Sequence, residues 1–166
     1  MPMSSYLRAL RERVGNHLLV LPSVSALIFD ERGDVLLARH ADGGVWATPG
    51  GAVEPEEQPY EAVIREVREE TSLVVEPIAL RGVFGGPDLR VRYPNGDETS
   101  YVTAIFECRV TGGTLRVDDV EILEARFVPP AEVMSLSLAP FARSLLPTLL
   151  AQRGATHLAW PRGVSR

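Results

Sequence analysis

The chain has 166 residues, 45% of them hydrophobic and 23% charged, which is ordinary for a globular protein long enough to bury a core. Its net charge of −5 disfavours a nucleic-acid polymer as the main partner, and no apolar run reaches the roughly 18 residues needed to span a bilayer. All 17 basic residues are arginine, which excludes lysine chemistry, and the single Cys108 excludes an internal disulfide. We therefore expect one domain over residues 1–166 and a cytoplasmic location, which a lone thiol suits.

The first half of the chain predicts a terminal helix followed by short strands. Residues of about 4–14 have helical spacing and should dock as an N-terminal helix. Strands are predicted over 23–30 and 35–39, joined by a turn that contains Gly33. A loop rich in Gly and Pro, with a short strand inside it, follows over 44–58.

The second half predicts a central helix, more strands and two closing helices. The central helix runs over 59–71, with Pro59 suited to its first position. Strands are predicted over 73–84, 89–93, 100–110 and 121–128, and helices over 129–134 and 140–152. Strands mixed with few helices indicate an α+β fold in which a sheet packs between helices.

The central helix carries its charges in an unusual position. On a helical wheel the apolar side chains gather on one side and should face the core; they are Tyr60, Val63, Ile64 and Val67. Glu66, Glu69 and Glu70 form an adjacent arc, although like charges three and four residues apart repel one another on a helix. Glu66 and Glu70 project in parallel and can together hold a divalent cation such as Mg²⁺ or Mn²⁺.

The helix by itself leaves a second interpretation open, in which it is solvated and held by ion pairs from Arg65 to Glu61 and Glu69. The preceding loop favours a metal site, because Gly50 and Gly51 let the backbone approach a ligand closely. A tight turn after a strand would use the same two glycines, so the pair alone does not decide.

The spacing from Gly51 to the glutamates is the specific signal. Residues 51–73 resemble the signature of the Nudix hydrolases, G-x5-E-x7-R-E-U-x-E-E-x-G-U, in which U is bulky and aliphatic. The matching residues are Gly51, Glu57, Arg65, Glu66, Val67, Glu69, Glu70 and Leu73. Ser72 stands where the family has glycine, and a left-handed conformation there would cost a serine about 1 kcal/mol. The resemblance implies a Nudix-type α/β/α sandwich with a mixed central β-sheet.

The resemblance also implies an activity and a cofactor. Nudix hydrolases cleave a phosphoanhydride bond in a nucleoside diphosphate linked to another moiety, with Mg²⁺ as the expected cofactor and Mn²⁺ as its alternative. Carried over to this chain, Glu66 and Glu70 are the expected metal ligands, and Glu69 and the carbonyl of Gly51 are further ligands.

The same resemblance implies catalytic roles. Glu69 is expected to be either a ligand or a metal-assisted base. Arg65 should orient the carboxylates by pairing with Glu57 and Glu69, a bidentate role that lysine does not fill. Some family members take a base from a later loop, where this chain offers Glu121, although an exposed acidic turn explains Glu121 equally well.

The substrate stays open among nucleotide sugars or ADP-ribose, dinucleoside polyphosphates and nucleoside triphosphates. Trp46, Phe84 and Tyr93 can stack on a base, but isolated aromatic residues more often belong to the core. Arg90 and Arg92 can meet a phosphate or ribose, or simply form a solvated strand face.

Two classes of function follow from the resemblance. The first is an enzyme, and the second is a catalytically silent Nudix-fold sensor or interaction module that binds nucleotides. The intact Arg65, Glu66, Glu69 and Glu70 favour the enzyme, because a module that only binds need not keep them. The expected partner is a small nucleotide derivative, not a nucleic-acid polymer or a membrane. The family often dimerises, so a homodimer with the N-terminal helix at its interface is also considered.

Overall fold

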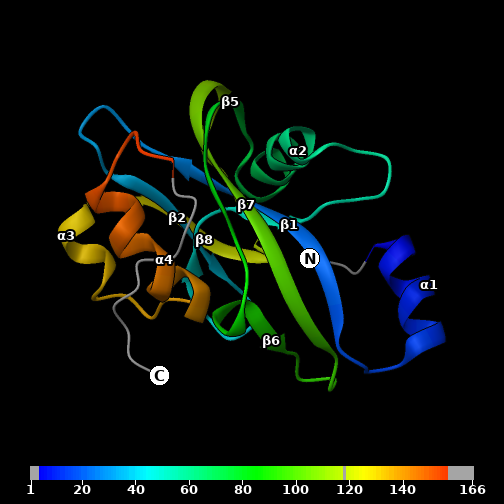
Figure 1. Ribbon diagram of the computed structural model, residues 1–166. Coiled ribbons are helices and arrows are strands. Elements are labelled where there is room, and N and C mark those ends of the chain that lie inside the picture. The colour runs from blue at the N-terminus through cyan, green and yellow to red at the C-terminus, as the bar shows by residue number, and fades with distance from the viewer. Residues whose placement is uncertain (1–3, 118, 157–166) are drawn as a thin grey trace.

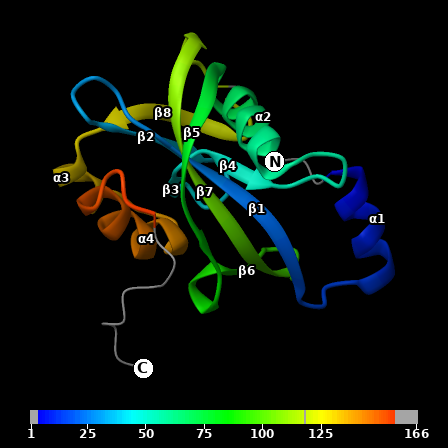
Figure 2. The same ribbon diagram turned by 45° about the horizontal axis from the view of Figure 1, so that its top comes forward.

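The computed structural model describes residues 4–117 and 119–156, so both ends of the predicted domain lie outside the described residues. The described chain forms two β-sheets flanked by helices (Figures 1 and 2). The strands are β1 (Leu19–Ile28), β2 (Val35–His40), β3 (Trp46–Ala47), β4 (Gly50–Ala52), β5 (Leu73–Phe84), β6 (Arg90–Arg92), β7 (Glu98–Gly113) and β8 (Ile122–Val128). The helices are α1 (Ser5–Val14), α2 (Pro59–Thr71), the 3₁₀ turn η1 (Pro87–Leu89), α3 (Pro130–Val133) and α4 (Pro140–Ala151).

The larger sheet is mixed. Its strand order is β4-β1-β7-β5, and β6 pairs with β7. β1 and β7 run parallel along the whole of β1, whereas the other pairs are antiparallel. The smaller sheet, β3-β2-β8, is antiparallel. The prediction of an α+β fold with a mixed sheet between helices is confirmed, and the second sheet is an addition that the sequence did not indicate.

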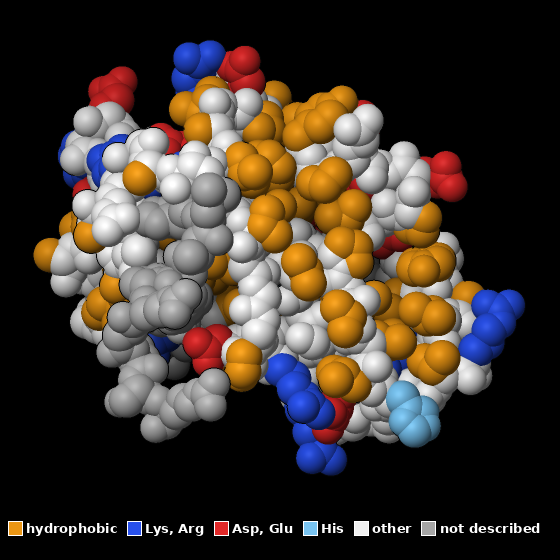
Figure 3. Space-filling view, viewed as in Figure 1, with side chains coloured by type: hydrophobic (Ala, Val, Ile, Leu, Met, Phe, Trp, Pro, Cys, Tyr) orange, Lys and Arg blue, Asp and Glu red, His pale blue; other side chains and the backbone are white. Residues whose placement is uncertain are grey.

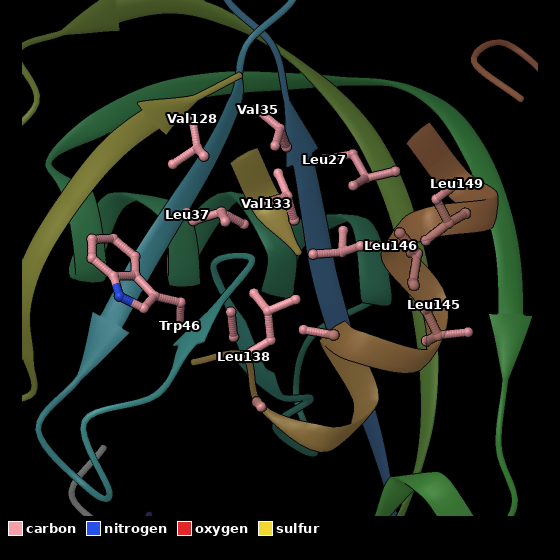
Figure 4. Packing of buried hydrophobic residues seen from close by; sticks show 14 of the residues in the cluster. Leu27, Val35, Leu37, Trp46, Val128, Val133, Leu138, Leu145, Leu146 and Leu149 are labelled. Carbon is pink, nitrogen blue, oxygen red and sulfur yellow. The ribbon is translucent and has the colours of Figure 1, made fainter. Parts of the chain in front are cut away.

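One hydrophobic core lies under α4, where side chains of both sheets meet (Figure 4). β1 contributes Leu27, β2 contributes Val35 and Leu37, and β7 contributes Ile105, all of them at most 2% exposed. Figure 4 shows these strands facing the leucines of α4, which are Leu145, Leu146 and Leu149. The leucines follow the helical spacing that the sequence predicts, and α4 contains Pro147 within its span.

A second core lies under α2, on the opposite side of β1. Val63 and Val67 of α2 are fully buried against Val24 and Ile28 of β1. α2 has the predicted bounds, because Pro59 occupies its first turn and the backbone N–H of Gln58 donates to the Glu61 carboxylate at 2.8 Å. The prediction that Tyr60 faces the core is wrong, since Tyr60 is 47% exposed. Its hydroxyl donates to Glu61, and a phenol with a polar tip favours such a half-exposed place.

β1 begins four residues earlier than predicted and passes through Pro22. The carbonyl of Pro22 accepts from the N–H of Val53 at 3.1 Å, so the missing N–H of Pro22 is directed to the same side. β4 has ended there, at Ala52 opposite Ser23, and a proline is tolerated where the ladder stops.

Helix α1 stands at the side of the molecule, next to the start of β1 (Figures 1 and 2). Arg11 is its one buried residue and donates to the carbonyls of His17 and Glu98 and to the hydroxyl of Thr99, at 2.7 to 2.9 Å. A single arginine therefore ties α1 to the start of β7. Across the residues that the structure describes, no helix is both long and apolar enough to cross a membrane.

Ser72 ends α2 in the left-handed conformation that the signature glycine would adopt, at φ 59° and ψ 9°. We expect Ser72→Gly to raise the free energy of unfolding by about 0.5–1 kcal/mol, because glycine enters this region without the clash of a Cβ. Urea unfolding measures the change. Ser72→Ala is the matched control and should give no gain, since alanine keeps the Cβ; an equal gain in both variants would contradict the strain.

Candidate metal centre

Two carboxylates of α2 lie out of contact with water. Glu66 is 0% exposed and Glu70 is 6% exposed, and both sit beside the buried Val63 and Val67. The Oε2 atom of Glu66 is buried and has no hydrogen-bond partner within the described structure. A buried carboxylate oxygen without a donor is strongly unfavourable, so it marks a place where a cation or another donor belongs.

Arg65 is the hub of the site. Its guanidinium donates to Glu57 at 2.6 and 3.0 Å, to Glu66 Oε1 at 2.8 Å and to Glu69 at 3.1 Å. A further donation reaches the Ala52 carbonyl at 3.1 Å, at the end of β4. The planar fork of arginine thus joins the loop before α2 to the glutamates on it, which a point charge would not do.

Glu70 is held by the backbone of Gly50. The Gly50 N–H donates to Glu70 Oε2 at 3.1 Å. Gly50 has a φ of 154°, and a Cβ on it would lie 2.2 Å from the carbonyl oxygen of Val24. No other residue fits at this position, so Gly50 is required for a steric reason. Gly51, the predicted ligand, is the next residue of β4 and pairs with Val24.

Burial shapes the electrostatics of this pair. It raises the pKa of Glu66 to about 7, against the attraction of Arg65. It also raises the pKa of Glu70 to about 8, aided by the charge of Glu66 and opposed by the Gly50 N–H. The Arg65 guanidinium lowers the pKa of Glu57 instead, so Glu57 stays ionised as the partner of the arginine.

The other two predicted catalytic glutamates lie at the border of the buried pair. Glu69 has a side chain 57% exposed and is engaged by Arg65. Glu121 directly precedes β8, and its charge contributes to the raised pKa of Glu70, after burial and Glu66. The Glu121 carbonyl accepts from the N–H of Ala41, which fastens this segment to the loop after β2.

A hydroxyl pair behind Gly50 is a feature that the sequence did not reveal. Ser25 Oγ and Thr48 Oγ1 lie 2.6 Å apart, and both residues are at most 5% exposed. Ser25 pairs with Gly50 across β1 and β4, so the hydroxyls brace the segment that presents the Gly50 N–H to Glu70. Ser25 lies on β1 and Thr48 lies between β3 and β4, far apart in the sequence, so local spacing does not predict that they meet.

The donor set suits a hard divalent cation. Glu66 and Glu70 offer carboxylate oxygens, and one of these lacks any donor. Among residues 4–117 and 119–156, no three His, Cys, Asp or Glu side chains converge into a closed metal cage. Two carboxylates fit Mg²⁺, which keeps several waters and commonly completes its shell with substrate phosphates.

The structure decides the open questions about the aromatic and arginine residues. Trp46 and Phe84 are 7% and 8% exposed and belong to the core under α4, which confirms the expectation that isolated aromatic residues belong to the core. The Tyr93 hydroxyl is hydrogen-bonded to that of Tyr101, at 2.7 Å. Arg90 and Arg92 both pair with Glu98, as a solvated strand face would.

The NUDIX domain model matches residues 20–149, so the chain belongs to the NUDIX domain family and is a Nudix hydrolase. Helix α2 with its glutamates and the loop of Gly50 and Gly51 lie within the matched range. The signature residues that predicted the family are therefore those that form the buried site.

Comparison with known proteins supports this assignment. A "MutT-like protein" of Streptomyces ambofaciens is 33% identical over 127 residues, which cover 76% of this chain and 75% of that protein. An "ADP-ribose pyrophosphatase" of Methanocaldococcus jannaschii is 36% identical over 103 residues, or 60% of this chain, and the match spans 57% of that protein. The crystal structure of a "UDP-X diphosphatase" has the same fold, with a TM-score of 0.68, 20% identity and coverage of 93% of this chain and 74% of that one.

The buried carboxylates predict how stability depends on pH. Because the folded pKa values of Glu66 and Glu70 lie above the ordinary 4.5, the folded state retains protons that the unfolded chain has released. The free energy of unfolding of the metal-free protein should therefore fall as the pH rises from about 5 to about 8. Urea unfolding in EDTA at several pH values measures this slope.

Glu70→Gln should flatten that slope, because the amide does not ionise. The difference in slope between variant and wild type separates the contribution of Glu70 from that of His40. Burial lowers the pKa of His40 below 6.5, so His40 makes the free energy of unfolding rise with pH. Glu56→Gln removes an exposed glutamate from the loop before α2 and serves as the control. A Glu70→Gln slope as steep as that of Glu56→Gln would contradict the prediction.

Arg65→Lys tests the hub. A lysine keeps the charge but cannot donate to Glu57, Glu66 and the Ala52 carbonyl together, so we expect the free energy of unfolding to fall by about 1–3 kcal/mol. Arg68→Lys is the matched control on the same helix, where the side chain is exposed and the change should stay within about 0.5 kcal/mol. Chemical denaturation compares the two; equal losses would mean that Arg65 acts only as a charge.

Proposed function

We propose that this Nudix hydrolase is a Mg²⁺-dependent pyrophosphohydrolase, which cleaves a phosphoanhydride bond in a nucleoside diphosphate linked to another moiety. The main support for this proposal is the pair of buried carboxylates, Glu66 and Glu70, in which the Oε2 atom of Glu66 has no hydrogen-bond donor in the described part of the chain. Burial of two neighbouring acids is costly unless something compensates, and a divalent cation compensates both at once. A silent binding module would have no need for this arrangement.

In the proposed site, Glu66 and Glu70 hold the metal, with the Gly51 carbonyl and Glu69 as additional ligands. Mg²⁺ is the natural ion for such oxygen donors, and Mn²⁺ is the alternative. When bound, the metal neutralises the phosphates and lowers the pKa of water. Arg65 keeps the carboxylates in position through its bonds to Glu57 and Glu66.

The proposed reaction is hydrolysis. Water adds its oxygen to a phosphorus atom, the bridging oxygen leaves with the bonding electrons, and a carboxylate accepts the proton of the water. Glu69 and Glu121 are the proposed bases, since Arg65 links Glu69 to Glu66 and the charge of Glu121 acts on the pKa of Glu70. Both lie outside the most buried part of the site, where a base can exchange its proton with solvent.

The proposed substrate is a small nucleotide derivative, and the class extends over nucleotide sugars or ADP-ribose, dinucleoside polyphosphates and nucleoside triphosphates. The name of one relative, "ADP-ribose pyrophosphatase", supports the inclusion of ADP-ribose in the proposal. The net charge of −5 argues against a nucleic-acid polymer, and the lone Cys108 suits a cytoplasmic setting. We also propose that the chain forms a homodimer.

Release of phosphate-containing products from a panel of nucleotides tests the proposal. The panel contains nucleoside triphosphates, ADP-ribose, nucleotide sugars, dinucleoside polyphosphates and coenzyme A, each with and without Mg²⁺. We expect turnover of one class of substrate in the presence of Mg²⁺. Glu70→Gln should lower this turnover at least about 100-fold, which is the typical cost of removing one group that stabilises charge in the transition state. Glu56→Gln should leave turnover unchanged.

Binding of a nucleotide without any product would sink the hydrolase proposal and favour the sensor. Isothermal titration of Mg²⁺ into the nucleotide-free protein gives a readout that does not depend on turnover. Loss of Mg²⁺ binding in Glu70→Gln, but not in Glu56→Gln, is the expected result, whereas equal binding by both variants would place the metal elsewhere.

A further inference from the structure

The most extensive apolar surface in the view of Figure 3 lies over β1, β5 and β7. Its aliphatic residues are 41% to 67% exposed; they are Val20, Ile78, Leu80, Val83 and Val102. We call this set, together with the exposed Pro22 between Val20 and Val24, the apolar sheet face. It has no part in the metal centre.

Strand register shows that most of the apolar sheet face belongs to one side of the larger sheet. Pro22 is opposite Val102 across the parallel pair, and Val83 is opposite Ala104. This is the same side of the sheet that α2 covers further along β1, where Val24 is only 2% exposed. Val20, four residues before Val24, is 67% exposed. Helix α2 therefore covers one half of this side, and no element of the described chain buries the other.

The size of the face matches the core of a stable interface. The five aliphatic residues expose on the order of 400 Å² of apolar surface, which is in the range of the largest patch on a typical monomer, and such patches are often functional. A standard protein interface buries about 800 Å² on each partner, with an apolar centre and a polar rim. The apolar sheet face supplies such a centre.

We propose that the apolar sheet face is where a second copy of this chain docks, face to face about a two-fold axis. The face is formed by a sheet, so two copies can match the same patch with itself, as two-fold pairing requires. None of its residues is charged, so two chains of net charge −5 can meet there without placing like charges at the centre. The same net charge disfavours an anionic membrane as the occupant.

Pairing along the edge of β5 is a poorer solution. β5 is the edge strand, but it contains Pro77 and its register shifts three times against β7. Proline and bulges are devices that prevent strand addition at an edge. The geometry therefore favours packing on the face of the sheet. The N-terminal helix expected at the interface lies at the rim, where α1 leads into β1 (Figure 1).

Such a dimer would border the metal centre without entering it. Val53 donates its N–H to the Pro22 carbonyl, and its neighbour Ala52 accepts from Arg65. A partner on the apolar sheet face thus packs next to the loop that carries Glu57. This inference rests on the proposed homodimer and is independent of the proposed chemistry.

Light scattering after size-exclusion chromatography tests the interface, over about 1–100 µM protein, the range of ordinary dimer affinities. The wild type should have twice the 18.2 kDa chain mass, and Val102→Glu and Val83→Glu should each be monomeric. Met134→Glu is the matched control, because Met134 on the far side at α3 is 43% exposed against 44% for Val102. It should stay dimeric.

A monomeric wild type at every concentration would overturn both the homodimer and this interface. A dimer that persists in Val102→Glu and Val83→Glu would overturn the interface alone. If the variants fail to fold, hydroxyl-radical footprinting of the wild type measures the solvent exposure of the same face. It should show at least threefold protection of Val83 and Val102 at high concentration and none at Met134; equal labelling at both concentrations would refute the interface. Turnover by a monomeric variant would leave the proposed hydrolysis intact.

Discussion

The burial of Glu66 and Glu70 side by side on α2 is the constraint on which the site depends. Burial raises the pKa of both acids, and the charge of Glu66 raises that of Glu70 further, so they are unfavourable as a charged pair. Arg65 satisfies one oxygen of Glu66 and leaves the other without a donor among the described residues. In the proposed site a divalent cation compensates the charges of the two acids.

The surrounding structure holds this unfavourable arrangement in place. Val63 and Val67 fasten α2 to the core, so the helix cannot roll its carboxylates outward without exposing apolar surface. Gly50 reaches Glu70 only because it has no Cβ to meet the Val24 carbonyl. The Ser25 and Thr48 hydroxyls then brace the strand behind it. The packed core in this way fixes the positions of the charged groups.

The length of α2 also explains the exposed half of the larger sheet. Its 13 residues span about 20 Å, which is shorter than β7 with its 16 residues. α2 therefore shields one end of the sheet and carries the glutamates at its border, while the other end stays apolar and open (Figure 3). One helix thus sets the limits both of the metal centre and of the surface assigned to a second copy.

The sequence alone determined what depends on short-range spacing. The start of α2 was predictable because Pro59 suits the first position of a helix. The interval from Gly51 to Glu70 indicated the family because it matches the Nudix signature, which is a pattern of residues close together in the chain.

Only the tertiary structure decided what depends on contacts between distant segments. The division of the strands into two sheets, the burial of Trp46 and Phe84, and the pairing of Ser25 with Thr48 all join residues from separate elements. The exposed half of the larger sheet along β1 is a further result of this kind. Local spacing determines on which face of its own helix or strand a side chain lies. Whether that side chain is buried, and which residues it contacts, depends on which other element packs against that face.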